Sequence, residues 1–317
     1  MQVVHGYRDV PQTARGAVLA IGNFDGVHRG HQALIKAAVN EARAIGAPSG
    51  VLVFEPHPRE FFHPEEQHFR LTPLKEKLQI FEALGLDLVI VLTFDAGLAG
   101  LPADDFIKRV LIEALKARHI VIGHDFFFGK GRSGTPETMQ AAAAALGFGV
   151  TVVAPVAEDG EVFSSSAIRL RLAQGDAKGA ARVLGRWWRS GGTVVGGAKR
   201  GMGLGFPTAN VPLPRGTGLG HGIYAVRAYV GAECYNGAAY LGTRPTYDDG
   251  MPVLEVFLFG FEGDLYGREI GVEFIDFIRA DRKFATSEAL IAQMAADCAC
   301  ASEILAQAPA EPRVAQN

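Results

Sequence analysis

Cysteine is scarce in this sequence of 317 residues, and the three that occur, Cys234, Cys298 and Cys300, include no CxxC pair. An odd number at such spacing argues against both a disulfide framework and a structural zinc site. Basic residues are not in excess either, because 31 Lys and Arg stand against 34 Asp and Glu. This balance excludes a strongly basic surface of the kind that binds nucleic acid.

Long apolar runs are also missing. Residues 1–16 carry Gln2, His5, Arg8, Asp9 and Gln12 and hold no apolar core of a secretory signal. No later run approaches the ~20 apolar residues of a membrane span. We therefore expect a cytoplasmic protein with neither a membrane nor a nucleic acid among its partners.

Two familiar nucleotide-binding motifs are absent as well. The sequence has no GxxxxGK[ST] P-loop, so any kinase chemistry needs another way to hold phosphate. Glycines between residues 201 and 205 imitate a dinucleotide fingerprint, which must open a helix. Pro207, Pro212 and Pro214 prevent that helix, so we reject the dinucleotide interpretation.

The pattern of apolar residues and glycines differs between the two halves of the chain. The length favours two domains, and a hydrophobic content of 48% is enough for packed cores. In the first half, apolar runs alternate with helical patterns, which predicts a Rossmann-like domain with a parallel sheet. The expected strands are 18–21, 50–54, 87–94, 119–123 and 149–156, and the expected helices are 32–44, 74–84, 104–118 and 136–146.

From residue 191 onward, glycines become frequent and the apolar runs become short and alternating. This texture predicts an antiparallel β-barrel, followed by a helix over 287–305. We place the domain boundary after residue 184, which gives domains 1–184 and 185–308 and a flexible tail over 309–317. The expected strands of the barrel are 193–195, 223–230, 233–241, 253–259 and 270–278.

The most informative stretch is GNFDGVHRGH, residues 22–31, which joins the first strand to the first helix. A glycine turn at a helix N-terminus aims backbone N–H groups at one point, where phosphate binds. His28 and His31, on either side of Gly30, can both face that point and donate hydrogen bonds to an α-phosphate and its leaving pyrophosphate. Two histidines can also be metal ligands or ordinary residues at a helix cap, but no further ligands at zinc spacing lie nearby. We interpret the stretch as a nucleotidyl-transfer site.

Other candidate residues follow the neighbouring strands, whose carboxyl ends share one edge of a parallel sheet. His57, between two prolines after the second strand, is either a triphosphate contact or a solvated loop histidine. The phenylalanines 126–128, after the fourth strand, either stack on a ring or belong to the core. Ser164–Ser166 and Arg169 surround a helix start, where they form a phosphate clamp or simply cap the helix.

In the second half, Thr208 and Asn210 are two residues apart, so on an extended backbone they project to the same face. Their oxygens suit a magnesium ion beside ATP phosphates, although Pro-Thr-Ala-Asn is otherwise an ordinary turn. Glu255 is a lone carboxylate in an apolar strand. Such an acid either points to solvent or serves as a general base.

These motifs together resemble those of the bifunctional riboflavin kinase/FMN adenylyltransferases, the prokaryotic FAD synthetases. GNFDGVHRGH is similar to their HxGH signature, and residues 164–169 are similar to their Ser-Ser-Thr-x-Ile-Arg, with Ser166 in place of threonine. The runs 205–210, 242–246, 263–267 and 282–284, with Glu255, look like riboflavin kinase motifs in the family's order. The resemblance covers residues 22 to about 305.

The resemblance implies a role for each matching residue. His28 and His31 would be catalytic in FMN adenylylation, and Glu255 would take the proton from the 5′-hydroxyl of riboflavin. Thr208 and Asn210 would hold Mg²⁺. ATP would be bound for adenylylation by Gly22, Asn23, Phe24, Gly30, His57, Ser164, Ser165, Ser166 and Arg169, and for the kinase step by Gly205, Pro207, Thr208 and Asn210. Flavin would be bound for adenylylation by Phe54, Asp125, Phe126 and Phe128, and for the kinase step by Arg282 and Phe284.

The implied function is phosphorylation of riboflavin to FMN in the C-terminal half and adenylylation of FMN to FAD in the N-terminal half, both with ATP and Mg²⁺. The expected partners are riboflavin, FMN and ATP, and the expected assembly is a monomer or weak homo-oligomer. Met202, Tyr240 and Phe257 depart from the family pattern. The alternatives are a different adenylyltransferase and a flavin sensor whose kinase half has lost activity.

Overall fold

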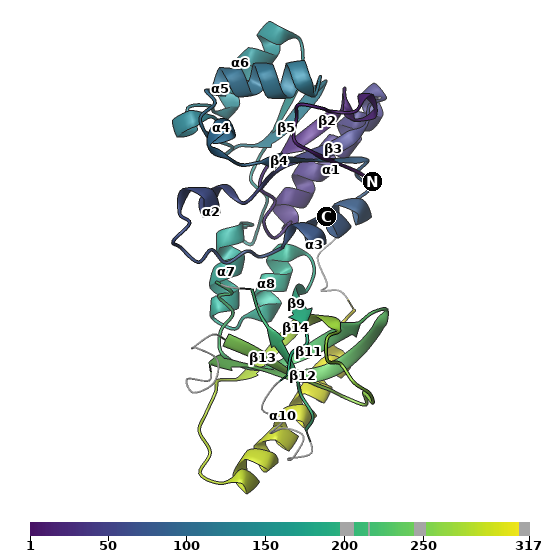
Figure 1. Cartoon of the computed structure of the whole chain (residues 1–317), viewed down its shortest axis with the longest axis vertical. Helices are drawn as coiled ribbons and strands as arrows, with labels where there is room; N and C mark the ends of the chain where they lie inside the picture. The colour runs from purple at the N-terminus through teal and green to yellow at the C-terminus, as the bar shows by residue number, and fades with distance from the viewer. Residues whose placement is uncertain (197–205, 215, 244–251, 311–317) are drawn as a thin grey trace. The chain divides into compact units, whose positions relative to one another are not determined.

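The computed structural model describes residues 1–196, 206–214, 216–243 and 252–310 (Figure 1). The chain forms two compact units. The first comprises Met1–His68 and Thr72–Ser164, and the second comprises Phe69–Leu71 and Ser165–Asn317. Helices α7 (Ser165–Ala173) and α8 (Ala177–Leu184) therefore belong to the second unit, whereas our boundary after residue 184, which stays a prediction, would assign them to the first.

The first unit is built on a six-stranded sheet in the order β1-β4-β3-β2-β5-β6, with every pair parallel. The predicted parallel sheet is confirmed. β1 was not among the predicted strands, because Gln2-Val-Val-His is short and only Val4 is buried. The strands are β1 (Gln2–His5), β2 (Val18–Ile21), β3 (Ser49–Glu55), β4 (Leu88–Thr93), β5 (His119–Gly123) and β6 (Gly149–Val153).

Helices cover both faces of this sheet (Figure 1). Alternate residues of the strands point to opposite faces, so Leu19 and Ile21 of β2 belong to one core cluster and Val18 and Ala20 to the other. The helices α1 (Arg29–Ile45) and α3 (Leu74–Ala83) pack on the side of Val18, and η2 (Phe106–Ala114) and α6 (Pro136–Leu146) pack on the side of Leu19.

The helix expected over 104–118 changes its hydrogen-bonding pattern after its first turn. It starts as α5 (Ala103–Asp105) and continues as η2 in π-helical geometry, in which the Leu115 N–H donates to the carbonyl of Val110. Short elements fill the remaining connections: η1 (Gln12–Ala14), α2 (Pro58–Phe62), α4 (Ala96–Ala99), η3 (Lys130–Arg132), β7 (Ala157–Glu158) and β8 (Glu161–Val162).

The strand order fixes where a ligand binds in the first unit. From β2 the chain moves outward through β3 to β4, then returns to the other side of β2 to form β5 and β6. The crevice at the carboxyl end of β2 is thus the topological switch point, where open parallel sheets bind ligands. GNFDGVHRGH begins directly after β2.

The second unit contains a six-stranded antiparallel sheet in the order β10-β13-β12-β11-β14-β9. The N–H of Val195, just after β9, donates to the carbonyl of Asn210 in β10 over 2.9 Å, which nearly closes the sheet. The predicted barrel is confirmed. Its strands are β9 (Trp188–Thr193), β10 (Ala209–Pro212), β11 (Gly222–Val230), β12 (Glu233–Thr243), β13 (Pro252–Leu258) and β14 (Glu269–Arg279).

Residues 69–71 belong to this second unit although they lie early in the sequence. The carbonyl of Leu71 accepts a hydrogen bond from the buried indole of Trp188 at 3.0 Å. The ring of Phe69 meets Trp188 edge to face at 5.6 Å, and its carbonyl accepts from Nε of Arg169 at 2.8 Å. The segment thus covers the first residue of β9.

The C-terminal helix α10 (Ser287–Gln307) packs on β11, β12 and β14, as Ala301 and Leu305 join a cluster with Ala225 and Ala238. We expected no run of membrane-spanning length, but an 18-residue window of this helix has a mean hydropathy of 1.4. The helix is thus long and apolar enough to cross a membrane, and 17% of that window is buried. A single such helix is weak evidence for a span. Asp297 on this helix binds a residue of the barrel, Arg279 of β14.

Asp297 is 5% exposed and forms a two-pronged ion pair with Arg279 at the end of β14, with Nε–Oδ1 2.9 Å and Nη2–Oδ2 2.7 Å. We expect Asp297→Ala to lower the free energy of unfolding of the second unit by about 3–5 kcal/mol, because it leaves the guanidinium without its carboxylate. Urea unfolding followed by tryptophan fluorescence reports this unit, since both tryptophans, Trp187 and Trp188, lie in it. The exposed Glu303→Ala on the same helix should change stability by less than ~0.5 kcal/mol; equal losses in both variants would contradict the prediction.

Candidate active sites

The loop after β2 has an unusual backbone. Phe24 and Val27 have φ of +50° and +42°, and Gly26 lies between them at +88°. Side-chain-bearing residues rarely adopt this left-handed region, and such strain is found at ligand-binding sites whose surroundings enforce it. Both Phe24 and Val27 are fully buried, so core packing holds the turn in this shape.

Two buried charged side chains fasten the same loop. Lys77 of α3 is 2% exposed and donates from Nζ to the carbonyl of Asn23 at 3.1 Å. Asp25 is 3% exposed and accepts at Oδ1 from the N–H of Thr72 at 3.1 Å. Sequence reasoning missed these contacts, because a lysine within an amphipathic helix normally indicates a solvated face. The hydrogen bonds of Lys77 and Asp25 thus hold the loop after β2 in place.

His28 and His31 lie together as predicted. Their rings stack at 3.6 Å between centroids with an angle of 22°. His28 is the N-cap of α1, and its Nδ1 accepts from the N–H of His31 at 3.3 Å. The cap places the proton of neutral His28 on Nε2, leaving that nitrogen as a donor. A Cβ added at Gly30 would lie 3.1 Å from the His28 ring, which explains why glycine stands between them.

The ring of Phe24 supports this pair from the core. It lies 5.1 Å from the ring of His31 and 5.6 Å from that of Phe81, and it is 0% exposed. Any contact of Phe24 with a ligand is therefore through its backbone. Gly22 and Asn23, which open the loop, are half-buried.

His57 lies beside a second, unpredicted histidine. It caps α2 by accepting at Nδ1 from the N–H of Arg59 at 3.2 Å, and its ring stacks on that of His68 at 4.6 Å. Nε2 of His68 is 4.0 Å from Oδ2 of Asp25, and its side chain is 7% exposed. His68 thus connects the loop after β3 with the loop after β2. Its position thirteen residues after the end of β3 gave no pattern from which to predict this.

The aromatic candidates for flavin binding fall into two groups in the first unit. Phe54 is 9% exposed and meets Phe94, which also contacts Phe61 and the 58% exposed Phe62. Phe61, Phe62 and Phe94 were not predicted. In the other group, Phe126 stacks on the buried Phe128 at 5.4 Å, and Asp125 beside it is exposed.

The serines of the predicted phosphate clamp fall on both sides of the unit division. Ser164 belongs to the first unit, where the carbonyl of the preceding Phe163 would lie 3.4 Å from a Cβ on Gly30. This places the chain at Ser164 beside the HxGH turn. Ser165, Ser166 and Arg169 open α7 in the second unit, and Nε of Arg169 donates to the carbonyl of Phe69.

In the barrel, the predicted kinase residues Thr208, Asn210 and Glu255 come together where β10 begins beside β13. Asn210 and Glu255 are directly opposite in the antiparallel register, and the hydroxyl of Thr208 donates to Oε2 of Glu255 at 3.5 Å. Asn210 is 7% exposed, whereas Thr208 and Glu255 are half-buried. Three oxygen-bearing side chains thus lie together, and the spacing predicted the shared face of Thr208 and Asn210 but not the arrival of Glu255.

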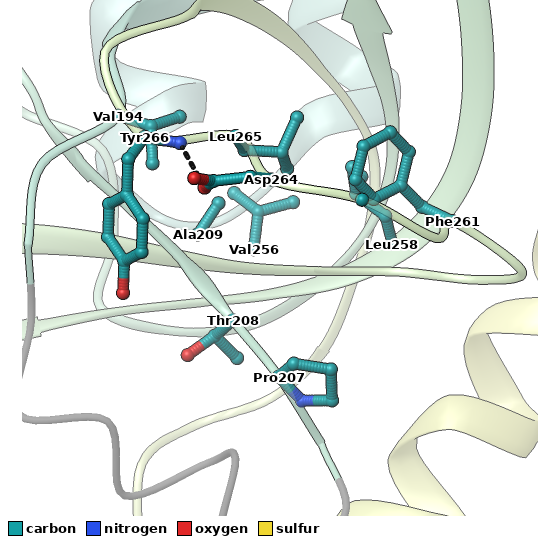
Figure 2. Close-up of a pocket in the computed structure, with 11 residues that line it drawn as sticks. Val194, Pro207, Thr208, Ala209, Val256, Leu258, Phe261, Asp264, Leu265 and Tyr266 are labelled. Carbon is teal, nitrogen blue, oxygen red and sulfur yellow. Dashed lines mark hydrogen bonds between the residues drawn. The ribbon is translucent and has the colours of Figure 1, made fainter.

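A cavity of about 120 Å³ adjoins this cluster. Figure 2 shows Pro207 and Thr208 on one side of it, with Asp264 and Tyr266 on another. The N–H of Tyr266 donates to Oδ1 of Asp264 at 2.9 Å, which shapes the loop after β13. The remaining walls are mostly apolar: Val194, Ala209, Val256, Leu258, Phe261 and Leu265.

Arg282 and Phe284 lie in the segment between β14 and α10, with the guanidinium 4.8 Å from the ring centroid. Arg282 is exposed and donates to the side chain of Gln293 on α10. Gly205 and Met202 lie outside the described residues.

Comparison with known proteins identifies the two halves separately. The family profile described as FAD synthetase matches residues 10–167, and the one described as riboflavin kinase matches residues 184–305. A bifunctional riboflavin kinase/FMN adenylyltransferase of Pseudomonas fluorescens is 41% identical over 96% of this chain and 98% of its own length. The chain belongs to this bifunctional family. A second member, from Escherichia coli K12, is 40% identical over 94% of this chain and 96% of its own.

The family membership inferred from the motifs is confirmed, and so is the order of the two halves, with the riboflavin kinase/FMN adenylyltransferase members matching along nearly the whole chain. Among solved structures, one from Streptococcus pneumoniae matches with a TM-score of 0.85 and 30% identity, over 97% of this chain and 99% of that one. It is described as a macrolide-efflux protein. The likeness supports the fold, and the efflux in that description refers to that protein.

Proposed function

We propose that this chain converts riboflavin to FMN in its barrel unit and FMN to FAD at the loop after β2, using ATP in both steps. The observation that carries the proposal is the pair of preformed clusters, His28 with His31 and Glu255 with Thr208 and Asn210, each in the half that matches the corresponding family. Each cluster supplies the chemistry that its reaction requires.

In adenylylation, a phosphate oxygen of FMN attacks the α-phosphorus of ATP, the bond to the β-phosphate breaks, and pyrophosphate leaves. The nucleophile is already ionised, so this step depends on position and on neutralising charge more than on a base. We assign the Nε2–H of His28 and the ring of His31 to the α-phosphate and the bridging oxygen. Gly22, Asn23, Gly30, His57, Ser164, Ser165, Ser166 and Arg169, with the backbone of Phe24, are assigned to the rest of ATP.

We assign the flavin of FMN to the aromatic groups of the first unit. Phe54, Asp125, Phe126 and Phe128 remain the proposed contacts. The exposure of Phe62 beside Phe61 and Phe94 adds a surface on which an aromatic ring can stack.

In the kinase step, the 5′-hydroxyl of riboflavin attacks the γ-phosphorus of ATP, and ADP leaves. A neutral hydroxyl benefits from a base, and Glu255 is the carboxylate in reach of Thr208. Pro207 and Thr208 line the cavity that we assign to ATP. Gly205, which lies outside the described residues, is assigned to ATP from its sequence motif alone. Arg282 and Phe284 are assigned to the flavin.

The kinase cluster fits a magnesium ion. Mg²⁺ prefers hard oxygen ligands, and Thr208 and Asn210 present a hydroxyl and a buried amide on one face. When bound, the ion would offset charge on the ATP phosphates.

We also infer a reducing, cytoplasmic location. All three cysteines are free thiols. Burial, and secondarily the nearby Asp297, raises the pKa of Cys298 to about 11, so this thiol stays protonated and unreactive. A monomer or weak homo-oligomer stays our prediction for the assembly.

The direct test is to incubate the purified chain with ATP and Mg²⁺, supplying riboflavin in one reaction and FMN in another, and to separate the flavins chromatographically. We expect FAD in both reactions and none in either when EDTA replaces Mg²⁺. FAD from FMN alone would show an inactive kinase half. Accumulation of FMN without FAD would show an inactive adenylyltransferase, and no product in either would refute the proposed function.

A further inference from the structure

One side-chain hydrogen bond ties the segment before α10 to strand β12 of the barrel. The hydroxyl of Tyr240 on β12 donates to Oδ2 of Asp281 over 3.0 Å. The other oxygen of Asp281 accepts from the backbone N–H of Arg282 at 2.8 Å. Asp281 thus connects β12 to the backbone of the residue that we assign to the flavin.

Tyr240 itself stands next to the candidate base. In the register of β12 and β13, Tyr240 is directly opposite Glu255. Opposed residues of antiparallel strands have their Cβ atoms about 4.5–5.5 Å apart and on the same face. The tyrosine therefore spans from the neighbourhood of Glu255 to the segment that carries Arg282 and Phe284.

The sequence makes room for this contact. Gly242, two residues further along β12, shares the face of Tyr240. A Cβ at Gly242 would lie 2.0 Å from the Tyr240 hydroxyl oxygen and 2.3 Å from the ring carbon that bears it. Any side chain at position 242 must push the hydroxyl away from where it meets Asp281.

The far end of the segment is held independently. Arg282 donates to Gln293, whose Nε2 in turn donates to Oδ1 of Asp297 at 2.8 Å. Asp297 also holds Arg279. On the other side of the segment, the Tyr240–Asp281 bond joins it to β12.

We propose that Tyr240 is a positioning residue of the kinase site, which holds Asp281 so that Arg282 and Phe284 are ordered against the flavin ring beside Glu255. This inference rests on the proposed kinase function. It gives a role to a residue that otherwise counts as a departure from the family pattern. Tyr240 touches the segment and not the reacting atoms, so its effect falls on flavin binding.

The test compares Tyr240→Phe, which removes only the hydroxyl, and Gly242→Ala, which displaces it. A hydrogen bond to a charged group is worth about tenfold in binding, so each variant should raise the KM for riboflavin about tenfold. The KM for ATP and kcat should stay within about twofold, because the nucleotide cavity and Glu255 are unchanged. The double variant should be no worse than either single one, since both remove the same bond.

Tyr229→Phe is the matched control. Tyr229, on β11, also donates to a carboxylate, Oε2 of Glu273, at 3.0 Å, but it pairs with Cys234 at the opposite end of the β11–β12 ladder from Gly222. This variant should leave the KM for riboflavin unchanged. The rate at which each variant converts supplied FMN to FAD should also be unchanged, which shows that the first unit is folded, while an unchanged KM for ATP shows that the barrel is.

An unchanged KM for riboflavin in Tyr240→Phe would overturn the inference. So would an equal rise in Tyr229→Phe, or a parallel rise in the KM for ATP, because either would indicate a general loss of barrel structure. Failure of the unmodified chain to form FMN would overturn the proposed kinase function and the inference with it, which is a distinguishable result.

Discussion

Glu255→Gln is expected to lower the rate of FMN formation from riboflavin by at least about 100-fold, the lower end of what a general base contributes. Glutamine keeps the size of the side chain and a carbonyl oxygen for Thr208, but it cannot take a proton at neutral pH. Glu255 pairs with Asn210 and contacts Thr208, so the substitution alters the centre of the kinase cluster while preserving its packing. The measurement is the initial rate of FMN appearance with saturating riboflavin and ATP.

The same protein carries its own control. Supplied FMN should be converted to FAD by Glu255→Gln at the rate of the unmodified chain, because His28 and His31 belong to the other unit. A kinase rate within about threefold of the unmodified chain would remove Glu255 from the role of base, since that is far below the contribution of a base. Loss of both activities would indicate misfolding instead.

Replacing His28 or His31 should have the opposite effect, with FAD formation lowered about 100-fold or more and FMN formation retained. Removing one donor that stabilises transition-state charge typically costs 10²–10³ in rate, to order of magnitude. His28→Asn is the sharper variant. Asparagine is among the best N-cap residues, so it can keep the cap of α1 that the Nδ1 of His28 now provides, while the imidazole is lost.

The comparison separates a structural from a chemical role. Full FAD formation by His28→Asn would mean that His28 serves only as a helix cap, and full activity in both His28→Asn and His31→Gln would refute the proposed site. His5→Ala, an exposed histidine on β1 of the same unit, should leave both rates unchanged. Riboflavin should still be converted to FMN by all three variants.

The elements that could be predicted from the sequence are those whose signal is local. β2, β3 and β5 are uniform apolar runs, because both faces of a parallel strand are buried. The meeting of their loops at one edge follows from parallel topology alone. Thr208 and Asn210 could be placed on one face because a strand alternates strictly, whereas the position of Glu255 opposite Asn210 depends on the pairing of β10 with β13.

What sequence could not supply was long-range register. Tyr240 and Asp281 are 41 residues apart, and Lys77 and Asn23 are 54 apart. No periodicity connects such pairs; they meet only after the sheet and its helices have packed. β1 was missed for a related reason, since its pairing with β4 joins residues more than 80 positions apart in the chain. The residues that shape the sites from behind were therefore the ones least visible in the sequence.

The early segment Phe69–Leu71 has a consequence for genetic dissection of the chain. A gene divided at a single point after residue 164 or 184 would encode a C-terminal fragment without these three residues. Either fragment would leave the indole N–H of Trp188 without its carbonyl acceptor and would expose the face of Trp188 that Phe69 covers. The fragment that begins at residue 165 would also leave Nε of Arg169 without the carbonyl of Phe69. We expect such a fragment to be soluble and active only when residues 69–71 are supplied in trans or grafted to its N-terminus, because three residues of the barrel unit are encoded within the sequence of the first unit.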